Sequence, residues 1–244
     1  MKRLLLSLLL VFSVGVSAET VEWLGGAYIG SLFKPTASLG DGTSRQISIP
    51  HGQGTLTWPN GRKYVGELKY GIIHGQGTVT LPDGMKFVGD FRDGRQHGHG
   101  SVTPPDSCNN NWTCSSYVGQ FRNGKPNGQG AMILRDGTKY VGQFRDSRWH
   151  GQGTLTAPNG RKYVGAFRNY QFNGRGKETW PTGQTYTGGY KDGVPHGYGA
   201  MSFPDGRNYV GELKNGCYWR GKESDKNGNV IATYSEGKRQ SQGV

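Results

Sequence analysis

The chain has 244 residues, 43 of them glycine, and a formal net charge of +12. Apolar residues make up only 33 % of it, which argues against a compact globule with a deep core. Glycine does not recur at every third position, which excludes a collagen-like triple helix, and the 13 tyrosines and 9 phenylalanines argue against a disordered linker. An extended array of small units, each burying surface only against its neighbours, fits this composition better.

The first 18 residues are predicted to be a secretory signal peptide. Lys2 and Arg3 form a positive segment, residues 4–16 form a short apolar stretch, and Val-Ser-Ala at 16–18 supplies the small residues of a cleavage site. The stretch is shorter than the about 20 residues that a spanning helix needs, and an uncleaved anchor is the competing interpretation. We therefore expect an exported protein, periplasmic or secreted, that associates at most peripherally with a membrane.

Two sequence anchors recur along residues 51–216 with one shared period. An aromatic-Val/Thr-Gly tripeptide begins at residues 64, 87, 117, 140, 163, 186 and 209, and a His/Asn-Gly-x-Gly tetrapeptide begins at residues 51, 74, 97, 127, 150, 173 and 196. The period is 23 residues, and an insertion at 104–116 lengthens one step to 30. Self-similarity at a fixed period indicates a repeat architecture.

Each unit is predicted to be a β-hairpin. Residues 140–145 alternate as a strand does, the His-Gly-x-Gly at 150–153 is expected to be a turn, residues 154–157 supply a second strand, and Pro-Asn-Gly at 158–160 closes the unit. One hairpin alone is marginal in water, so stacking must stabilise it. The predicted fold class is all-β: an elongated, single-layer antiparallel sheet of stacked 23-residue hairpins, with roughly 14 strands.

The pattern YxGxFxxGxxHGxGxxxxxxG resembles the MORN (membrane occupation and recognition nexus) repeat, in seven copies over about two thirds of the chain. The resemblance implies a groove-like sheet used for binding or assembly, sometimes at membranes, and it implies no single ligand. Several copies depart from the pattern. Ser147 and Tyr170 stand where a turn glycine is usual, and Asn127 and Asn173 replace the histidine.

The segments outside the repeats are predicted to be caps, at residues 19–50 and 217–244. Each contains a sequence that is similar to a degraded copy of the unit, at 28–30 and 234–238. Open edges at the two ends of the sheet make a homodimer through those ends an expected assembly.

The three cysteines bear on redox chemistry. Cys108 and Cys114 lie within the insertion at 104–116 and are expected to form a loop-closing disulfide, because an exported chain meets oxidising conditions. Cys217 is left over, and is either free or paired between chains. A zinc site at the two insertion cysteines would need two further ligands nearby, and the sequence supplies none.

Aromatic residues fall at two positions per unit that share strand parity, and hence one face of the predicted sheet. This aromatic ladder is either the packing surface of a thin protein or a groove for a peptide, an acyl chain or a sugar polymer. Tryptophans that stand off the repeat positions are the stronger candidates for recognition. The candidate binding residues of the aromatic ladder are Tyr117, Phe121, Tyr140, Phe144, Trp149, Tyr163, Phe167, Trp180 and Tyr186.

A basic residue follows the opening aromatic by five places in all seven units, at the opposite strand parity. The positive charge is concentrated in the middle of the chain, where it would attract anionic lipid headgroups, acidic glycans or an acidic protein. The alternative is a solvated face that prevents aggregation. The candidate binding residues of this basic strip are Arg122, Lys139, Arg145, Lys162 and Arg168.

Metal binding and catalysis have little support in the sequence. Five of the six histidines mark one repeat position about 10 Å apart, too far to share an ion, and they are expected to brace turns. Only His97 and His99 are close enough to chelate together. No Gly-x-Ser-x-Gly motif and no recurring carboxylate pair occurs, so neither a catalytic site nor a cofactor is predicted.

The sequence therefore predicts a non-enzymatic exported scaffold that holds an unidentified protein partner, at an anionic membrane surface. The alternative is direct binding of anionic phospholipid or an acidic glycan without a protein partner. An envelope hydrolase or transferase is the third function considered, and nucleic acid is not an expected partner.

Overall fold

The computed structural model describes residues 20–38, 43–108 and 114–241, so the predicted signal peptide lies outside the described residues. The described residues form 21 strands and no helix, and thus no helix that is long and apolar enough to cross a membrane. Nineteen strands belong to one open antiparallel sheet. The prediction of an all-β, single-sheet fold is confirmed. The sheet has more strands than expected because the segments that flank the repeats also fold into hairpins.

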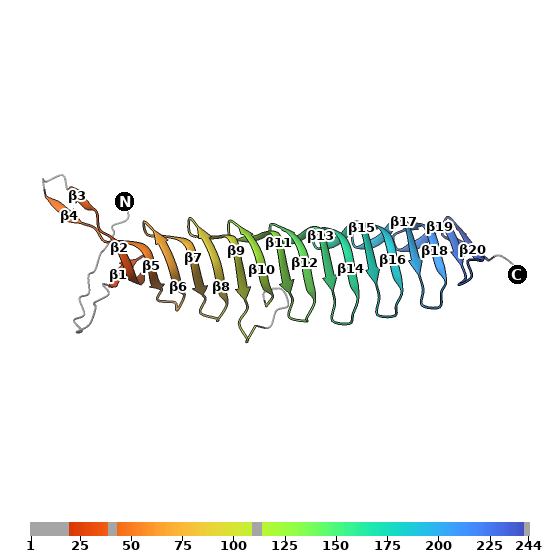
Figure 1. The fold of residues 1–244 in the computed structure, drawn as a ribbon, viewed down its shortest axis with the longest axis horizontal. Coiled ribbons are helices and arrows are strands. Elements are labelled where there is room, and N and C mark those ends of the chain that lie inside the picture. Colours follow the sequence, from red (N-terminus) through yellow and green to blue (C-terminus); the bar gives the residue numbers. More distant parts are fainter. Residues whose placement is uncertain (1–19, 39–42, 109–113, 242–244) are drawn as a thin grey trace. The chain divides into compact units, whose positions relative to one another are not determined.

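The chain divides into two compact units, unit 1 (residues 1–125) and unit 2 (residues 126–244). In unit 1 each strand of the large sheet pairs antiparallel with the next one, and the short β3–β4 ribbon interrupts the chain between β2 and β5 (Figure 1). The strands of unit 1 are β1 (Thr20–Trp23), β2 (Gly26–Phe33), β3 (Thr36–Ser38), β4 (Ser44–Gln46), β5 (Ile49–Thr57), β6 (Lys63–Lys69), β7 (Ile72–Thr80), β8 (Lys86–Arg92), β9 (Arg95–Thr103) and β10 (Ser116–Arg122).

In unit 2 the same antiparallel pairing runs without interruption from one strand to the next. The strands are β11 (Lys125–Ile133), β12 (Lys139–Arg145), β13 (Arg148–Thr156), β14 (Lys162–Arg168), β15 (Gln171–Thr179), β16 (Thr185–Lys191), β17 (Val194–Ser202), β18 (Asn208–Lys214), β19 (Cys217–Ser224), β20 (Val230–Ser235) and β21 (Lys238–Ser241). The predicted division into signal peptide, caps and repeat array stays a prediction.

The tight turn of each hairpin is not where the sequence analysis placed it. In the unit that begins at Tyr140, the turn is formed by Asp146 (φ 49°) and Ser147 (φ 67°), two positive φ angles of the kind that a two-residue hairpin turn needs. The His-Gly-x-Gly at 150–153 lies inside β13. The prediction that this tetrapeptide is a turn was therefore wrong.

The His-Gly-x-Gly motif instead forms a bulge. The register of β12 against β13 passes from Gly142 opposite Gly153 directly to Gln143 opposite His150, which leaves two residues of β13 unpaired with β12. Gly151, one of the two, has a φ of 58° that favours glycine. A bulge and a turn both call for glycine, which is why the sequence alone did not separate them.

A tyrosine ring fills the space that the glycines leave beside the bulge. Tyr140 is fully buried, and a Cβ on Gly153 would lie 2.6 Å from its ring. The Tyr140 hydroxyl donates to the carbonyl oxygen of Gln143 at 2.8 Å, and it also lies 3.3 Å from the carbonyl oxygen of His150. Gly151 is therefore favoured by its positive φ, and Gly153 by the close approach of the Tyr140 ring.

This tyrosine contact recurs through both units. The hydroxyl donates to the carbonyl three residues further along the chain, at 2.7–3.1 Å, for Tyr28, Tyr64, Tyr117, Tyr163, Tyr186 and Tyr209. Phe87 is the exception, since its ring packs against Gly100 in the same way but it has no hydroxyl. Tyr28 belongs to the sequence at 28–30, so that sequence builds a hairpin unit of the same kind.

The predicted disulfide is present between Cys108 and Cys114. It closes the insertion, whose residues 109–113 lie outside the described part of the chain. Cys217, at the start of β19, is an exposed free thiol.

Candidate functional site

The aromatic ladder lies in the core of the two units. Eight of its nine residues are buried, and only Trp180 is partly exposed. In unit 2 the ring of Tyr140 packs edge-on against Phe144 at 5.1 Å and Phe167 at 5.0 Å, and it stacks on Trp149 at 4.8 Å. The eight buried side chains are therefore not available to a ligand in the folded chain. For them the interpretation as a binding groove was wrong, and they form the packing surface.

The two tryptophans of the ladder do occupy repeat positions. Trp149 lies opposite Phe144 in the register, as Phe172 lies opposite Phe167 in the next hairpin. The backbone N–H of Trp180 donates to a carbonyl four residues on, at 2.9 Å, as its equivalents do in other units. The structural position is constant while the residue type changes from unit to unit, so the sequence pattern hid both positions.

The basic strip is exposed on the opposite face from the buried tyrosines. In unit 2, Arg145 and Arg168 end their strands, whereas Lys139 and Lys162 begin the same strands. Six residues of strand separate the two rows by about 20 Å, so the strip is two rows rather than one. Arg122 belongs to unit 1. Within the described residues, none of the five forms an ion pair.

An apolar row lies between the two basic rows of unit 2. Val141 and Val164 are 44 % and 46 % exposed, on the same face as Arg145 and Arg168. This outer face therefore combines an apolar centre with basic margins. A surface of that kind fits partners that present both anionic and apolar groups.

The structure brings together further basic residues outside the predicted strip. Arg148 begins β13 directly opposite Arg145, and His150, two residues on, lies opposite Arg168 of β14. Residues i and i+2 of a strand share a face, so all four side chains lie on the outer face of unit 2. The sequence signal was a second basic residue three places after the first. It occurs in only three of the seven units, as Arg95, Lys125 and Arg148, so the repeat pattern obscured it.

Unit 1 has an exposed cluster of rings that the sequence analysis missed. Phe33, His51 and Tyr70 form this aromatic patch, with ring centroids 5.5 Å apart for Phe33–Tyr70, 4.8 Å for His51–Tyr70 and 6.1 Å for Phe33–His51. Phe33 is 43 % exposed and Tyr70 is 56 % exposed. Ile72, half exposed, starts the strand that follows the turn. The three rings make a contiguous aromatic surface that is partly exposed.

Tyr70 holds an unusual backbone conformation. Its φ is 49°, a region that disfavours bulky side chains, and it is the first residue of a two-residue turn. The corresponding turn residues of the later units are all Asp or Asn: Asp93, Asn123, Asp146, Asn169, Asp192 and Asn215. A tyrosine at a turn position that holds Asp or Asn in the six later repeats was the sequence signal for this patch.

Two histidines of the repeat row brace turns, as expected. The Nδ1 of His51 accepts from the backbone N–H of Tyr70 at 3.3 Å, and that of His196 accepts from Asn215 at 3.4 Å. In the described part of the chain, no group of three or more His, Cys, Asp or Glu side chains is arranged to hold a metal ion.

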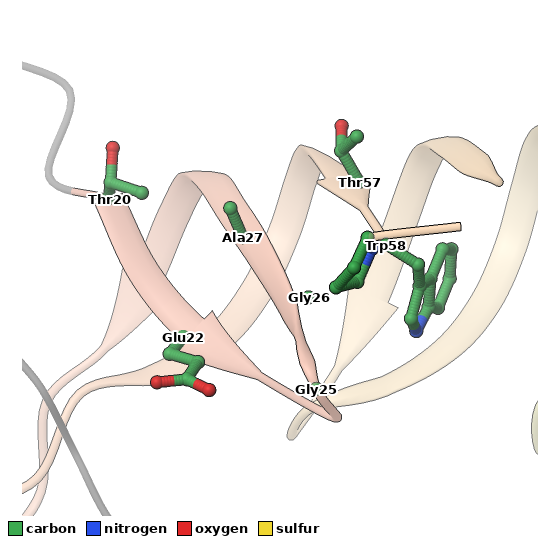
Figure 2. Close-up of a pocket in the computed structure, with 8 residues that line it drawn as sticks. Thr20, Glu22, Gly25, Gly26, Ala27, Thr57 and Trp58 are labelled. Atoms are coloured by element: carbon green, nitrogen blue, oxygen red, sulfur yellow. The ribbon is translucent and has the colours of Figure 1, made fainter. Parts of the chain in front are cut away.

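A shallow pocket of unit 1 lies between the β1–β2 turn and the loop after β5 (Figure 2). The Trp58 indole N–H donates to the carbonyl of Leu24 at 3.2 Å, and the Arg62 guanidinium lies 4.6 Å from the Trp58 ring centroid. The residues that line the pocket are Thr20, Glu22, Gly25, Gly26, Ala27, Thr57, Trp58 and Pro59. One carboxylate without a histidine or cysteine beside it does not make a nucleophile–base pair.

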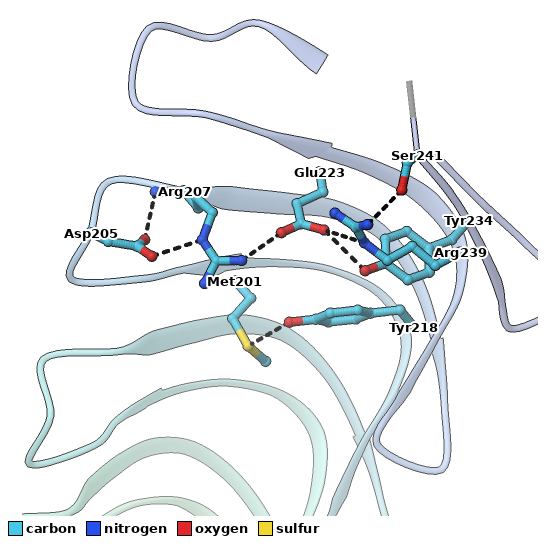
Figure 3. Close-up of polar contacts among 8 residues, drawn as sticks. All are labelled: Met201, Asp205, Arg207, Tyr218, Glu223, Tyr234, Arg239 and Ser241. Atoms are coloured by element: carbon cyan, nitrogen blue, oxygen red, sulfur yellow. Dashed lines mark hydrogen bonds and ion pairs between the residues drawn. The ribbon is translucent and has the colours of Figure 1, made fainter. Parts of the chain in front are cut away.

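Two buried carboxylates of unit 2 are held by cationic and phenolic donors. Glu223, 3 % exposed, accepts from Arg207 at 2.8 Å, Tyr234 at 3.0 Å and Arg239 at 3.3 Å (Figure 3). Burial alone would raise the pKa of the Glu223 carboxyl, but these hydrogen bonds outweigh it and lower that pKa. The network fixes the carboxylate between three donors, which suits a structural role.

Glu178 makes the equivalent contacts in an earlier hairpin. It is buried, it pairs with Arg161, and it accepts from the Tyr190 hydroxyl at 3.0 Å. Burial, followed by the Glu178 charge, raises the pKa of Tyr190. Leu155 occupies the same register position, opposite a tyrosine. Neither carboxylate was predicted from the sequence, although Glu178 in place of an aliphatic residue was visible in the repeat.

The family of the chain follows from its repeats. The model of the MORN repeat matches residues 49–61, 64–86, 87–107, 117–139, 140–160, 163–185 and 186–206, more than half of the chain. The chain belongs to the MORN repeat family. Membership points to a protein-interaction or scaffold role. The hairpins of β1–β2 and of β18–β21 have MORN-like strands but lie outside the matched residues.

Solved structures resemble this MORN chain only weakly. The TCP10 domain of Danio rerio CPAP, in complex with a peptide of Danio rerio STIL, has 16 % identity and a TM-score of 0.33, over 83 % of this chain and 99 % of that one. The SAS-4 (dCPAP) TCP domain of Drosophila melanogaster, in complex with a proline-rich motif of Ana2 (dSTIL), has 13 % identity and a TM-score of 0.34, over 86 % and 90 %. These values are too low to carry a conclusion about binding. No curated protein matches.

Proposed function

We propose that this MORN-repeat chain is an exported, non-enzymatic binding or scaffolding protein. One surface holds a partner protein, and the basic strip lies against an anionic surface of the cell envelope. The observation that carries the proposal is the aromatic patch of unit 1, because a contiguous exposed apolar cluster is typical of an interaction surface.

The chemistry of the patch favours a protein partner with an apolar or aromatic segment. Phe33 and Tyr70 supply uncharged rings, and the Nδ1 of His51 is occupied as an acceptor. Aromatic side chains dominate the binding energy of protein interfaces. Every two-residue hairpin turn of the described residues has this φ at its first residue, and the later repeats hold Asp or Asn there. A bulky ring is disfavoured at this φ, which supports a role for the Tyr70 ring that the turn itself does not need.

The test is capture of a partner from an envelope extract by the purified chain and by Tyr70→Asn. Asparagine is the natural residue at this turn position in other units, so the variant keeps the turn and removes only the ring. We expect at least about tenfold less captured partner, the size of a hot-spot loss. Tyr198→Asn, which removes an exposed tyrosine of unit 2, is the matched control. Equal capture by both variants contradicts the proposal.

Direct binding of an anionic phospholipid or an acidic glycan is the second candidate, supported by the exposed basic rows. Co-sedimentation with anionic and neutral vesicles at low and high salt tests it, beside a variant with Arg122, Arg145 and Arg168 changed to Glu. Binding held by exposed charge falls steeply with salt. Sedimentation that is equal for both vesicle types, or unchanged in the variant, contradicts this candidate.

Export and the absence of catalysis are parts of the same proposal. The proposed cleavage after Ala18 is tested by sequencing the N-terminus of the exported protein, and an intact N-terminus in the membrane fraction would favour an anchor instead. A hydrolase or transferase function has the weakest support, because the pocket and the buried carboxylates lack a nucleophile–base pair.

A further inference from the structure

A pair of arginines in unit 2 has no explanation in the fold. Arg145 and Arg148 lie directly opposite each other across the β12–β13 hairpin. Directly opposed like charges on neighbouring strands destabilise a sheet. In the other hairpins of unit 2 the corresponding basic residue faces an uncharged one: Arg168 faces Gln171, Lys191 faces Val194, and Lys214 faces Cys217. The repeat therefore does not require a second charge at Arg148.

A third arginine and a histidine complete the cluster on the same face. Arg168 of β14 lies opposite His150, which is two residues from Arg148 on β13. Neighbouring strands are about 4.8 Å apart, so the long side chains of Arg145, Arg148 and Arg168 reach a common point above His150. All three arginines are exposed.

The cluster has no internal counter-charge. No carboxylate of the described residues forms an ion pair with Arg145, Arg148 or Arg168, not even Asp146 in the turn between the first two. Other arginines of unit 2 do have such partners, as Arg161 has Glu178 and Arg207 has Glu223.

His150 differs from the two histidines of its row that brace turns. The Nδ1 atoms of His51 and His196 accept turn N–H groups, whereas the Nδ1 of His150 is buried without a hydrogen-bond partner among the described residues. An unpaired buried polar atom is costly and calls for an explanation. A ring that is not tied to the turn is free to reorient towards a ligand bound by the arginines.

We propose that Arg145, Arg148, Arg168 and His150 form a binding site for a phosphate oxyanion. The planar guanidinium fork matches phosphate oxygens two at a time, which a lysine cannot do. Phosphate supplies enough oxygens and charge to pair with several guanidinium groups at once. This inference rests on the basic-strip part of the proposed function and not on a protein partner.

The same residue types recur in unit 1. Arg92 lies directly opposite Arg95, and the repeat pattern places His97 and Arg122 at the positions of His150 and Arg168. The proposal therefore expects a second phosphate site in unit 1, so that the loss of one site leaves the other.

The test is binding of inorganic pyrophosphate to the purified chain by calorimetry at constant ionic strength, for wild type, Arg95→Gln, Arg148→Gln and the double variant. We expect each single variant to lose one of two sites and the double variant to bind at least tenfold more weakly. Lys191→Gln removes the same charge from a hairpin without an opposed pair, and we expect it to bind as wild type does.

Folding controls keep the test decisive. Because Arg148→Gln relieves like-charge repulsion, we expect its thermal midpoint to equal or exceed that of wild type. A loss of pyrophosphate binding by this variant is then not caused by unfolding. If Lys191→Gln weakened pyrophosphate binding as much as Arg148→Gln does, the general positive charge of the chain would account for the binding. That result would overturn the site. Absence of pyrophosphate binding by wild type would overturn it too.

Vesicles distinguish the source of the phosphate. In one outcome the chain sediments with phosphatidic acid vesicles, is displaced from them by pyrophosphate, and loses this binding in the Arg95→Gln/Arg148→Gln variant. That result identifies a lipid headgroup at the site. Pyrophosphate binding without vesicle binding identifies a free phosphate ligand. Both outcomes support the oxyanion site. Tyr70→Asn leaves pyrophosphate binding unchanged, so failure of the protein-partner proposal and failure of this one are distinguishable.

Discussion

The strands of unit 2 present two faces with opposite properties. On one face, Tyr140 and Tyr163 are buried among other rings, and their hydroxyls are used by backbone carbonyls. On the other face, Arg145 and Arg168 end the same strands exposed and without a carboxylate partner in the described residues. The inner face holds the hairpins together, and the proposed function assigns binding to the outer face. A residue type therefore recurs in this repeat for one of two reasons: it packs the inner face, as Tyr140 does, or it places charge on the outer face, as Arg145 does.

Raising the pH should ionise the buried tyrosines of the inner face and unfold the sheet. Burial raises the pKa of Tyr117 and Tyr163 to about 12, from about 10 in an unfolded chain. The folded state thus favours the neutral phenol, so this part of the stability is complete below about pH 10 and is lost as the pH rises through about 12. Tyrosinate absorbance and far-ultraviolet circular dichroism should change together above pH 10. Full tyrosinate formation with an unchanged sheet spectrum would contradict the account.

Removal of one inner ring should have the largest effect of any single substitution. Tyr163→Ala deletes a buried ring that stacks on Phe172 at 3.7 Å, and we expect the free energy of unfolding to fall by about 3–5 kcal/mol. Val164→Ala removes a half-exposed neighbour on the outer face and should cost less than about 1 kcal/mol. Urea denaturation measures both, and equal losses would show that the two faces do not differ.

The buried carboxylate of the inner face offers a sharper comparison. Arg161→Ala leaves Glu178 buried without its cation, and since Arg161 is half exposed we expect a loss of about 1–3 kcal/mol in urea denaturation. Glu178→Leu restores the residue type found at Leu155 and should be neutral or stabilising. A larger loss for Glu178→Leu than for Arg161→Ala would mean that the ion pair itself stabilises the hairpin.

The smallest expected effect concerns the tyrosine hydroxyl. Tyr140→Phe removes hydrogen bonds to the carbonyls beside the bulge and should cost about 1 kcal/mol. Phe87→Tyr is the reciprocal change, because Phe87 already packs against Gly100 as the tyrosines do, and it should stabilise the chain by a similar amount. Thermal midpoints that move in the same direction for both variants would contradict the role given to the hydroxyl.

The sequence predicted the period, the sheet and the disulfide because each depends on local pattern. Alternation and glycine spacing are enough to place Tyr140 and Arg145 on opposite faces. The pattern did not show that Gly151 lies in a bulge rather than a turn, since both conformations favour glycine. It also did not show that Trp149 fills a repeat position, because that position accepts any side chain that fits the core.

The candidate binding residues were harder to predict because they break the repeat instead of forming it. Tyr70 stands where the later repeats hold Asp or Asn, and Arg148 shares its charge only with Arg95 and Lys125. A periodic pattern treats such differences as noise. Their meaning depends on register: Arg148 matters because it faces Arg145, and Tyr70 because it reaches Phe33. Cross-strand neighbours of this kind become visible only when the hairpins are folded.

The central claim is that the outer face binds while the inner face folds. Its most direct test is vesicle co-sedimentation by the variant with Arg122, Arg145 and Arg168 changed to Glu, on protein shown to be folded by its thermal midpoint. The account predicts a midpoint close to that of wild type and loss of sedimentation with anionic vesicles. A lowered thermal midpoint with unchanged sedimentation would mean that the basic strip stabilises the fold and does not bind vesicles, and it would contradict the claim.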